Sequence, residues 1–266
     1  MALFARISDD WLSTEQKLLD ILADAPDNRL ALDYLVAQWQ SSGYLQDSWV
    51  LNEKALQFDL LRPVPLSRRA LKLWIMGKAG EADSVAARAV QLYPSHPMVW
   101  NARFLISAFT GRWQAARQLL AEQSDDSLIL TPAARQVWSI GLEALESRST
   151  QDIAAARSAG LEAARRSTGL ASQMVLVLSV LGEIDAAYEI MNGLLLRQGD
   201  VILRGRPDDA PAYQENNRAW RATQWLFTPA TRPLRADSRF SGMCDAIGLS
   251  SYWSRRGIPP DADTKA

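Results

Sequence analysis

The sequence has 266 residues, 48% of them hydrophobic, so the chain can bury a substantial core in one elongated domain or in two compact ones. Its 29 Lys and Arg residues balance 30 Asp and Glu residues, and a net charge of −1 predicts neither direct nucleic-acid binding nor attraction to an anionic membrane. The single cysteine, Cys244, cannot form an internal disulfide, and no apolar stretch approaches the ~20 residues of a membrane-spanning helix. The N-terminal segment reaches two aspartates before any apolar run long enough for a signal peptide, so we expect a cytoplasmic location and no membrane insertion.

The first expected element is a helix at roughly residues 10–24. It would cover the apolar face of the element that follows, as the ends of helical repeat arrays require. We therefore assign residues 1–28 to an N-terminal capping helix.

Three glycines at intervals of 34 residues then indicate an internal repeat. Gly43, Gly77 and Gly111 each lie in a polar turn between two stretches with the apolar period of a helix. Ala82 and Ala116 each follow their glycine by five positions, where a small side chain lets the second helix lie close against the first. The period predicts a series of helix pairs.

Beyond the third glycine the period loosens but continues. Ala116 and Ala154 are 38 residues apart, which indicates a four-residue insertion, and Gly182 then repeats the glycine-to-alanine spacing. We expect five helix pairs within residues 29–198, at roughly 29–60, 63–95, 97–124, 132–167 and 169–198.

This pattern resembles the tetratricopeptide repeat (TPR) family, and the best match is the third pair, with Trp100, Gly111 and Ala116. The resemblance implies an all-α fold, a right-handed alpha-alpha superhelix or TPR-like solenoid, with a helical C-terminal cap. It also implies that the first helices of the pairs line a concave groove.

In the register given by the glycines and Ala154, the resemblance places ten residues in the groove, which we expect to bind a partner: Asp33, Tyr34, Arg68, Leu71, Trp74, Asn101, Leu105, Phe109, Gln136 and Glu143. The set does not reproduce the Lys/Asn/Arg group by which some family members clamp a C-terminal carboxylate. An alternative interpretation is that Trp74, Leu105 and Phe109 belong to the core, or are covered by the chain's own C-terminal segment.

Residues 199–266 do not continue the repeat, and we expect a loop followed by a cap of short helices. The cap resembles the C-terminus of bacterial TPR proteins, including those fused to winged-helix regulators. The matching residues are Leu234, Arg235, Asp237, Arg239, Phe240, Gly248, Leu249, Tyr252 and Trp253. In those fusions a DNA-binding domain precedes the repeats, whereas this chain begins almost at its first repeat helix, so we do not expect direct DNA binding.

Two interpretations of this C-terminal segment are open. It covers the apolar end of the last helix pair, as a solenoid requires. Alternatively, Tyr252, Trp253, Arg255 and Arg256 form a docking tip for a partner, because aromatic and Arg residues dominate binding hot spots.

Residues for catalysis are scarce. The single histidine, His96, lies in a predicted turn, and Cys244 lacks the further ligands that a zinc site needs. No phosphate-binding GxxxxGK[ST] loop is present, and the aspartate pairs 125/126 and 208/209 are interpreted as solvated turn formers. We expect no enzyme activity, no cofactor and no metal.

The sequence therefore predicts a non-catalytic protein-protein interaction scaffold that binds a protein or peptide segment in the concave groove. The alternative is a sensory or regulatory domain that binds a peptide or a small molecule and acts on a transcriptional or signalling partner. The sequence specifies neither the partner nor the oligomeric state.

Overall fold

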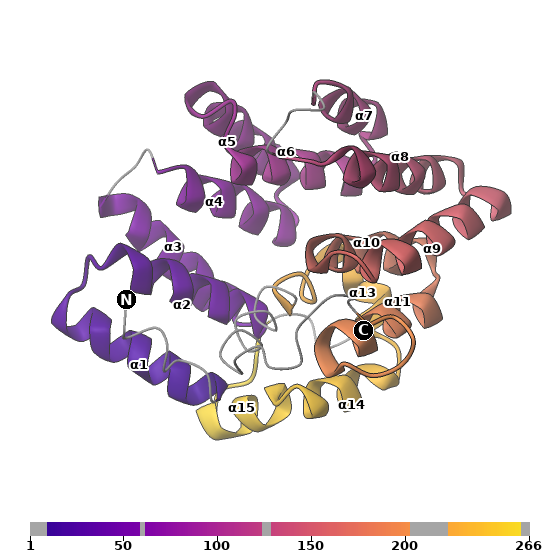
Figure 1. The fold of residues 1–266 in the computed structure, drawn as a ribbon. Coiled ribbons are helices and arrows are strands. Elements are labelled where there is room, and N and C mark those ends of the chain that lie inside the picture. The colour runs from indigo at the N-terminus through magenta and orange to yellow at the C-terminus, as the bar shows by residue number, and fades with distance from the viewer. Residues whose placement is uncertain (1–9, 59–61, 124–128, 203–222, 262–266) are drawn as a thin grey trace. The chain divides into compact units, whose positions relative to one another are not determined.

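The structure is a computed structural model that describes residues 10–58, 62–123, 129–202 and 223–261 (Figure 1). Every regular element in these ranges is a helix, so the predicted all-α fold of consecutive helix pairs is confirmed. None of the described helices is long and apolar enough to cross a membrane. The loop expected after residue 202 and the aspartate pairs 125/126 and 208/209 lie outside the described residues.

The helices follow the predicted order. A single helix, α1 (Trp11–Asp24), comes first. The pairs are α2 (Arg29–Ser41) with α3 (Leu45–Phe58), α4 (Pro63–Ile75) with α5 (Ala79–Leu92), α6 (Pro97–Phe109) with α7 (Trp113–Ala121), α8 (Pro132–Ser147) with α9 (Thr150–Ala164), and α10 (Thr168–Leu181) with α11 (Ile184–Met191). Shorter elements complete the chain: η2 (Asn192–Leu196), η3 (Pro229–Thr231), α13 (Arg232–Arg235), α14 (Arg239–Ala246) and α15 (Leu249–Arg256).

The turn inside four of the pairs depends on glycine. Gly43, Gly77, Gly111 and Gly182 have φ angles of 85°, 78°, 79° and 82°, in the left-handed region that glycine adopts without steric cost. The second helix begins two residues later in each case. The turn positions that the sequence predicts are therefore confirmed.

The fourth pair differs from the predicted register. Its left-handed turn residue is Arg148, with φ 53°, which lies 37 positions after Gly111. Ala154 is exposed, whereas Ala82 and Ala116 are fully buried between their helices. The physical reason is that α8 spans 16 residues where α6 spans 13, so part of the extra length lies inside the first helix rather than in the loop before it.

His96 has the turn role that its position predicts. It is the N-cap of α6, and its Nδ1 accepts a hydrogen bond from the backbone N–H of Met98 at 3.2 Å. Pro97 occupies the first helical position, where a missing N–H carries no cost.

The chain divides into two compact units: residues 52–163, and residues 1–51 together with 164–266. The organisation drawn from the sequence, with a cap at 1–28, repeats at 29–198 and a C-terminal segment at 199–266, follows the repeats rather than these units and remains a prediction.

Aromatic rings make up much of the core of the 52–163 unit. Phe104 stacks on Trp100 with ring centroids 4.9 Å apart and meets Trp138 edge-on at 4.6 Å. Trp74 stacks on Phe109 at 6.0 Å, and Phe109 meets Trp138 edge-on at 6.3 Å. Such rings bury large apolar areas, so they tie α4, α6 and α8 together.

In the other unit, α10 is buried over most of its length, from Ala171 to Ser179, because η3 and α13 pack on it beside its own partner α11. Helix α15 packs against α1. The chain also approaches itself closely after α11, where a methyl group on Gly193 would overlap the carbonyl oxygen of Val201. Only glycine fits at that position.

Candidate functional site

The ten residues predicted for the groove divide by burial. Leu71, Trp74 and Leu105 are buried, with exposed fractions of 4%, 4% and 0%. The other seven keep accessible surface: Asp33, Tyr34, Arg68, Asn101 and Phe109 are half-buried, and Gln136 and Glu143 are exposed. Asp33 and Tyr34 lie on α2 in one unit, and the other eight lie on α4, α6 and α8 in the other.

The apolar centre predicted for the groove is thus mostly core. Trp74 packs its ring against Phe109, and Leu105 has no exposed surface, so neither side chain presents an apolar face to a partner. The alternative interpretation of these two residues, as core, is the one that fits. The sequence misplaces them because, on a first helix, the positions that face a neighbouring pair and the positions that face the groove lie close together around the helix axis.

The accessible residues of the set still share helix faces. Asn101 and Phe109 are eight positions apart on α6, and Gln136 and Glu143 are seven apart on α8, so each pair lies on one side of its helix. Glu143 forms an ion pair with Arg117 at 3.3 Å. The surface they form is polar, with Phe109 as its accessible aromatic side chain.

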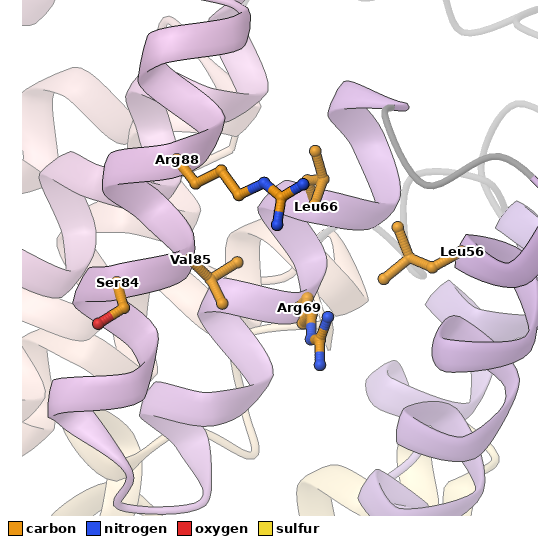
Figure 2. Close-up of a pocket in the computed structure, with 6 residues that line it drawn as sticks. All are labelled: Leu56, Leu66, Arg69, Ser84, Val85 and Arg88. Atoms are coloured by element: carbon orange, nitrogen blue, oxygen red, sulfur yellow. The ribbon is translucent and has the colours of Figure 1, made fainter.

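A pocket that sequence reasoning missed lies in the same unit (Figure 2). Its volume is about 310 Å³ and its walls come from α3, α4 and α5. We name it the α5 pocket; its lining residues are Leu56, Leu66, Arg69, Ser84, Val85 and Arg88. Leu56 and Leu66 are nearly fully buried and belong to an apolar cluster with Ala89 and Val99, so the pocket opens onto the core.

Two guanidinium groups stand at this apolar pocket. Arg69 forms an ion pair with Glu53 at 3.1 Å, and burial raises the pKa of the Glu53 carboxyl although the charge of Arg69 opposes the shift. Arg88 is exposed, and among the described residues it forms no ion pair. An apolar centre with arginine at its rim has the composition typical of binding surfaces. In the sequence, the one signal for the α5 pocket is the position of Arg88 beside the apolar residues of α5.

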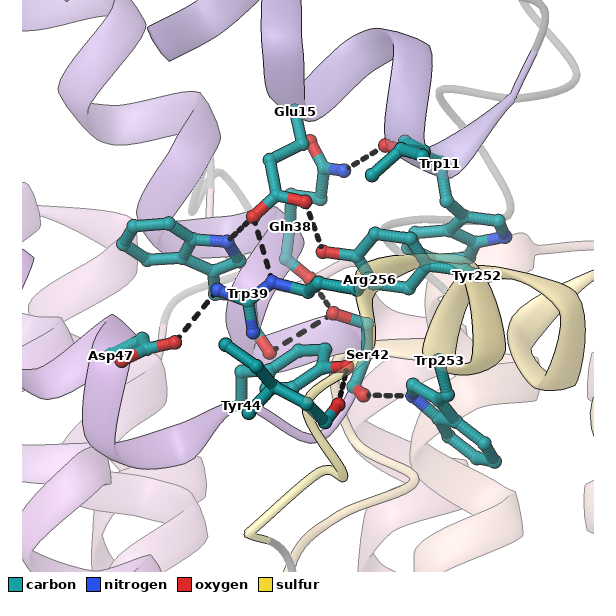
Figure 3. Close-up of polar contacts among 12 residues, drawn as sticks. Trp11, Glu15, Gln38, Trp39, Ser42, Tyr44, Asp47, Tyr252, Trp253 and Arg256 are labelled. Carbon is teal, nitrogen blue, oxygen red and sulfur yellow. Dashed lines mark hydrogen bonds and ion pairs between the residues drawn. The ribbon is translucent and has the colours of Figure 1, made fainter.

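The proposed docking tip at the C-terminus is used within the chain instead (Figure 3). Tyr252 on α15 is 1% exposed, and its hydroxyl donates a hydrogen bond to Glu15 on α1 at 2.9 Å. The indole N–H of Trp253 donates to the carbonyl of Ser42 at 2.8 Å. The interpretation as an open tip for a partner is therefore wrong for Tyr252, whereas Trp253 is half-buried and Arg255 stays exposed.

Arg256 is the centre of this internal contact. Its guanidinium pairs with Glu15 at 3.1 Å and with Asp47 at 2.8 Å, and it lies 3.7 Å from the ring centroid of Tyr44. The side chains of Arg256 and Glu15 are 12% and 6% exposed. Glu15 also accepts a hydrogen bond from the indole of Trp39 at 2.6 Å, so the buried carboxylate is satisfied on several sides.

The tail beyond α15 continues the contact. Tyr44 donates its hydroxyl hydrogen to the carbonyl of Ile258 at 2.6 Å. The carboxylate of Asp261 accepts from the backbone N–H groups of Leu45 and Gln46, both at 2.6 Å. A residue far along the chain thus supplies the N-terminal cap of α3.

The segment also covers the last helix pair, as its first interpretation predicts. The Tyr188 hydroxyl on α11 donates to the carbonyl of Leu234 at 3.1 Å, and the guanidinium of Arg239 lies 4.4 Å from the centroid of the Tyr188 ring. Arg239 also holds Asp237 in a hydrogen-bonded ion pair at 2.8 Å, which lowers the pKa of that carboxyl to about 2. The C-terminal segment therefore contacts both α10–α11 and α1–α3.

The described residues contain no group of three or more His, Cys, Asp or Glu side chains that could hold a metal ion. Cys244 is buried, and burial raises the pKa of its thiol to about 12. The thiol is protonated at neutral pH and does not have the character of a nucleophile.

Comparison with known proteins gives a structural similarity at low identity. No family model matches the sequence, and no curated protein matches it. The chain is similar to the crystal structure of a tetratricopeptide repeat protein from Parabacteroides merdae, with 14% identity and a TM-score of 0.44, over 91% of this chain and 92% of that one. At this level of similarity nothing about function carries over.

Proposed function

We propose that this protein is a non-catalytic scaffold that binds a segment of another protein along the first helices of its pairs. The observation that carries the proposal is that α6 and α8 keep Asn101, Gln136 and Glu143 accessible beside their aromatic core, at whose edge Phe109 is half-buried. Helical repeat proteins present such first-helix faces to extended or helical partner segments. Arg68 on α4 belongs to the same proposed surface, and Asp33 and Tyr34 are the proposed contacts on α2.

The proposed partner is a protein or peptide rather than nucleic acid, because the charges of the chain nearly balance. The proposed location is the cytoplasm. It also assigns no reaction to the protein, since the ionisable groups with the largest pKa shifts are held in structural contacts rather than grouped in the pocket.

The test is the double variant Asn101→Ala and Gln136→Ala, with Lys54→Ala as the control. Lys54 is exposed on the second helix α3 of the same unit and lies outside the proposed surface. A partner is first captured from a lysate of the source organism, purified, and titrated against each variant by calorimetry. We expect the double variant to weaken binding by about tenfold or more and the control to leave it unchanged. Equal affinity for all three proteins would overturn the assignment of this surface.

A regulatory domain is the second candidate. The α5 pocket, at about 310 Å³, is at the lower end of the sizes of small-molecule sites, and it opens beside charged groups that could orient a ligand. The resemblance of the C-terminal segment to those of winged-helix fusion proteins also supports a transcriptional partner. Native mass spectrometry of the purified protein distinguishes the two candidates, because a retained small molecule adds a defined mass and a pure scaffold adds none.

A further inference from the structure

An exposed apolar side chain lies further along the helix that lines the α5 pocket. Val85 lines the pocket, and Leu92 lies seven positions later on α5 with 41% of its surface exposed. Seven residues rotate an α-helix by nearly two full turns, so both side chains lie on one face, about 10 Å apart along the axis. Arg88 lies between them. The face therefore presents an apolar position, a cation and a second apolar position in sequence.

The charge at this face is available to an incoming anion. Arg69, on the opposite wall, already holds Glu53 at 3.1 Å, and that pair neutralises much of its charge. Arg88 is exposed and forms no ion pair among the described residues. Of the two arginines at the pocket, Arg88 is thus the one whose charge is not matched by a described carboxylate.

We propose that the α5 pocket and Leu92 form a docking site for an amphipathic helical segment of a partner, with an acidic side chain between two apolar ones seven positions apart. The partner's seven-residue spacing matches the seven residues between Val85 and Leu92, because a helix lying along α5 has the same rise per residue. One apolar side chain of the partner fills the pocket, the carboxylate pairs with Arg88, and the second apolar side chain packs on Leu92. This inference rests on the proposed scaffold function and adds a second surface with a defined ligand chemistry.

Charge exchange tests the site directly. The probe is a short, fluorescently labelled, helix-favouring peptide with Leu, Glu and Leu at the first, fourth and eighth positions, and its twin carries Lys in place of Glu. Fluorescence anisotropy measures the affinity of each for the wild type and for Arg88→Glu. Arg103→Glu is the matched control, since Arg103 is exposed on α6 and does not line the pocket.

We expect the wild type and Arg103→Glu to prefer the Glu peptide by about tenfold or more, and Arg88→Glu to prefer the Lys peptide. Because Arg88 is exposed, thermal melting of Arg88→Glu should match that of the wild type. The site is refuted if neither peptide binds, or if Arg88→Glu keeps the preference of the wild type. It is equally refuted if sedimentation shows a dimer that Arg88→Glu dissociates, because the occupant would then be a second copy of this chain.

Loss of peptide binding in the Asn101→Ala and Gln136→Ala variant, with no effect of Arg88→Glu, would move the peptide to the first-helix surface. The scaffold function would then stand without this site. If instead Arg88→Glu reverses the peptide preference and the first-helix variant still binds the natural partner, the docking site on α5 stands and the first-helix surface is refuted.

Discussion

Two neighbouring arginines on α15 form ion pairs in very different surroundings, and replacing each by methionine should separate buried from exposed electrostatics. Arg256 pairs with Glu15 where the two side chains are 12% and 6% exposed. Arg255 pairs with Asp10 at 2.8 Å, where they are 52% and 35% exposed. Methionine keeps much of the length of the side chain and removes the charge.

The expected magnitudes follow from burial. Arg256→Met leaves the carboxylate of Glu15 buried without its cation, and breaking a buried pair in this way costs about 3–5 kcal/mol. Tyr252 and Trp39 still donate hydrogen bonds to Glu15, so we expect the lower end, about 3 kcal/mol. An exposed pair contributes about 0–1 kcal/mol, so Arg255→Met should lie within that range.

Thermal and urea unfolding, followed by circular dichroism and tryptophan fluorescence, measure both variants. For a chain of this size, about 3 kcal/mol corresponds to a fall in Tm of roughly 6–12 °C, and 1 kcal/mol to roughly 2–4 °C. A further variant combining Glu15→Gln with Arg256→Met should recover part of the loss, because no charge is then left buried. If Arg255→Met and Arg256→Met destabilise equally, or the combined variant recovers nothing, the contact in Figure 3 does not hold the C-terminal segment.

The other predictions concern packing and pH. Gly193→Ala should lower the Tm markedly, because its methyl group would overlap the carbonyl oxygen of Val201; an unchanged Tm would exclude that close approach. Trp74→Ala should cost about 3–5 kcal/mol in urea unfolding as a core cavity, whereas a cost below about 1 kcal/mol would return Trp74 to the groove. Burial raises the pKa of Cys244 from 9.0 to about 12, so its contribution to stability is complete below pH 9 and falls as pH rises toward 12. Unfolding free energies measured across this pH range should therefore fall less steeply in Cys244→Ala, and identical slopes would contradict the burial of the thiol.

Local features of the sequence predict the helix pairs well. A glycine every 34 residues marks a turn because only glycine takes a left-handed conformation without cost, and Gly43, Gly77 and Gly111 have that conformation. The same reasoning fails where a different residue takes the turn. Arg148 is left-handed at φ 53°, so the fourth pair has no glycine to fix its register, and Ala154 is a misleading substitute.

The candidate sites depended on tertiary packing. Helical period shows that Trp74 and Leu105 lie on an apolar face, but not whether that face meets a neighbouring helix or a partner. The α5 pocket combines Leu56, Leu66 and Arg88 from three helices, so no local pattern contains it.

The C-terminal segment shows the same division. The pattern of aromatic and arginine residues around Tyr252 is evident in the sequence, and two interpretations of it were open. Only the folded chain shows that Glu15, more than two hundred positions earlier, receives both Tyr252 and Arg256. The sequence by itself determines where helices begin, turn and end, because those preferences act between near neighbours. Which apolar and charged surfaces then meet depends on burying them against elements distant in the chain, and that choice belongs to the tertiary structure.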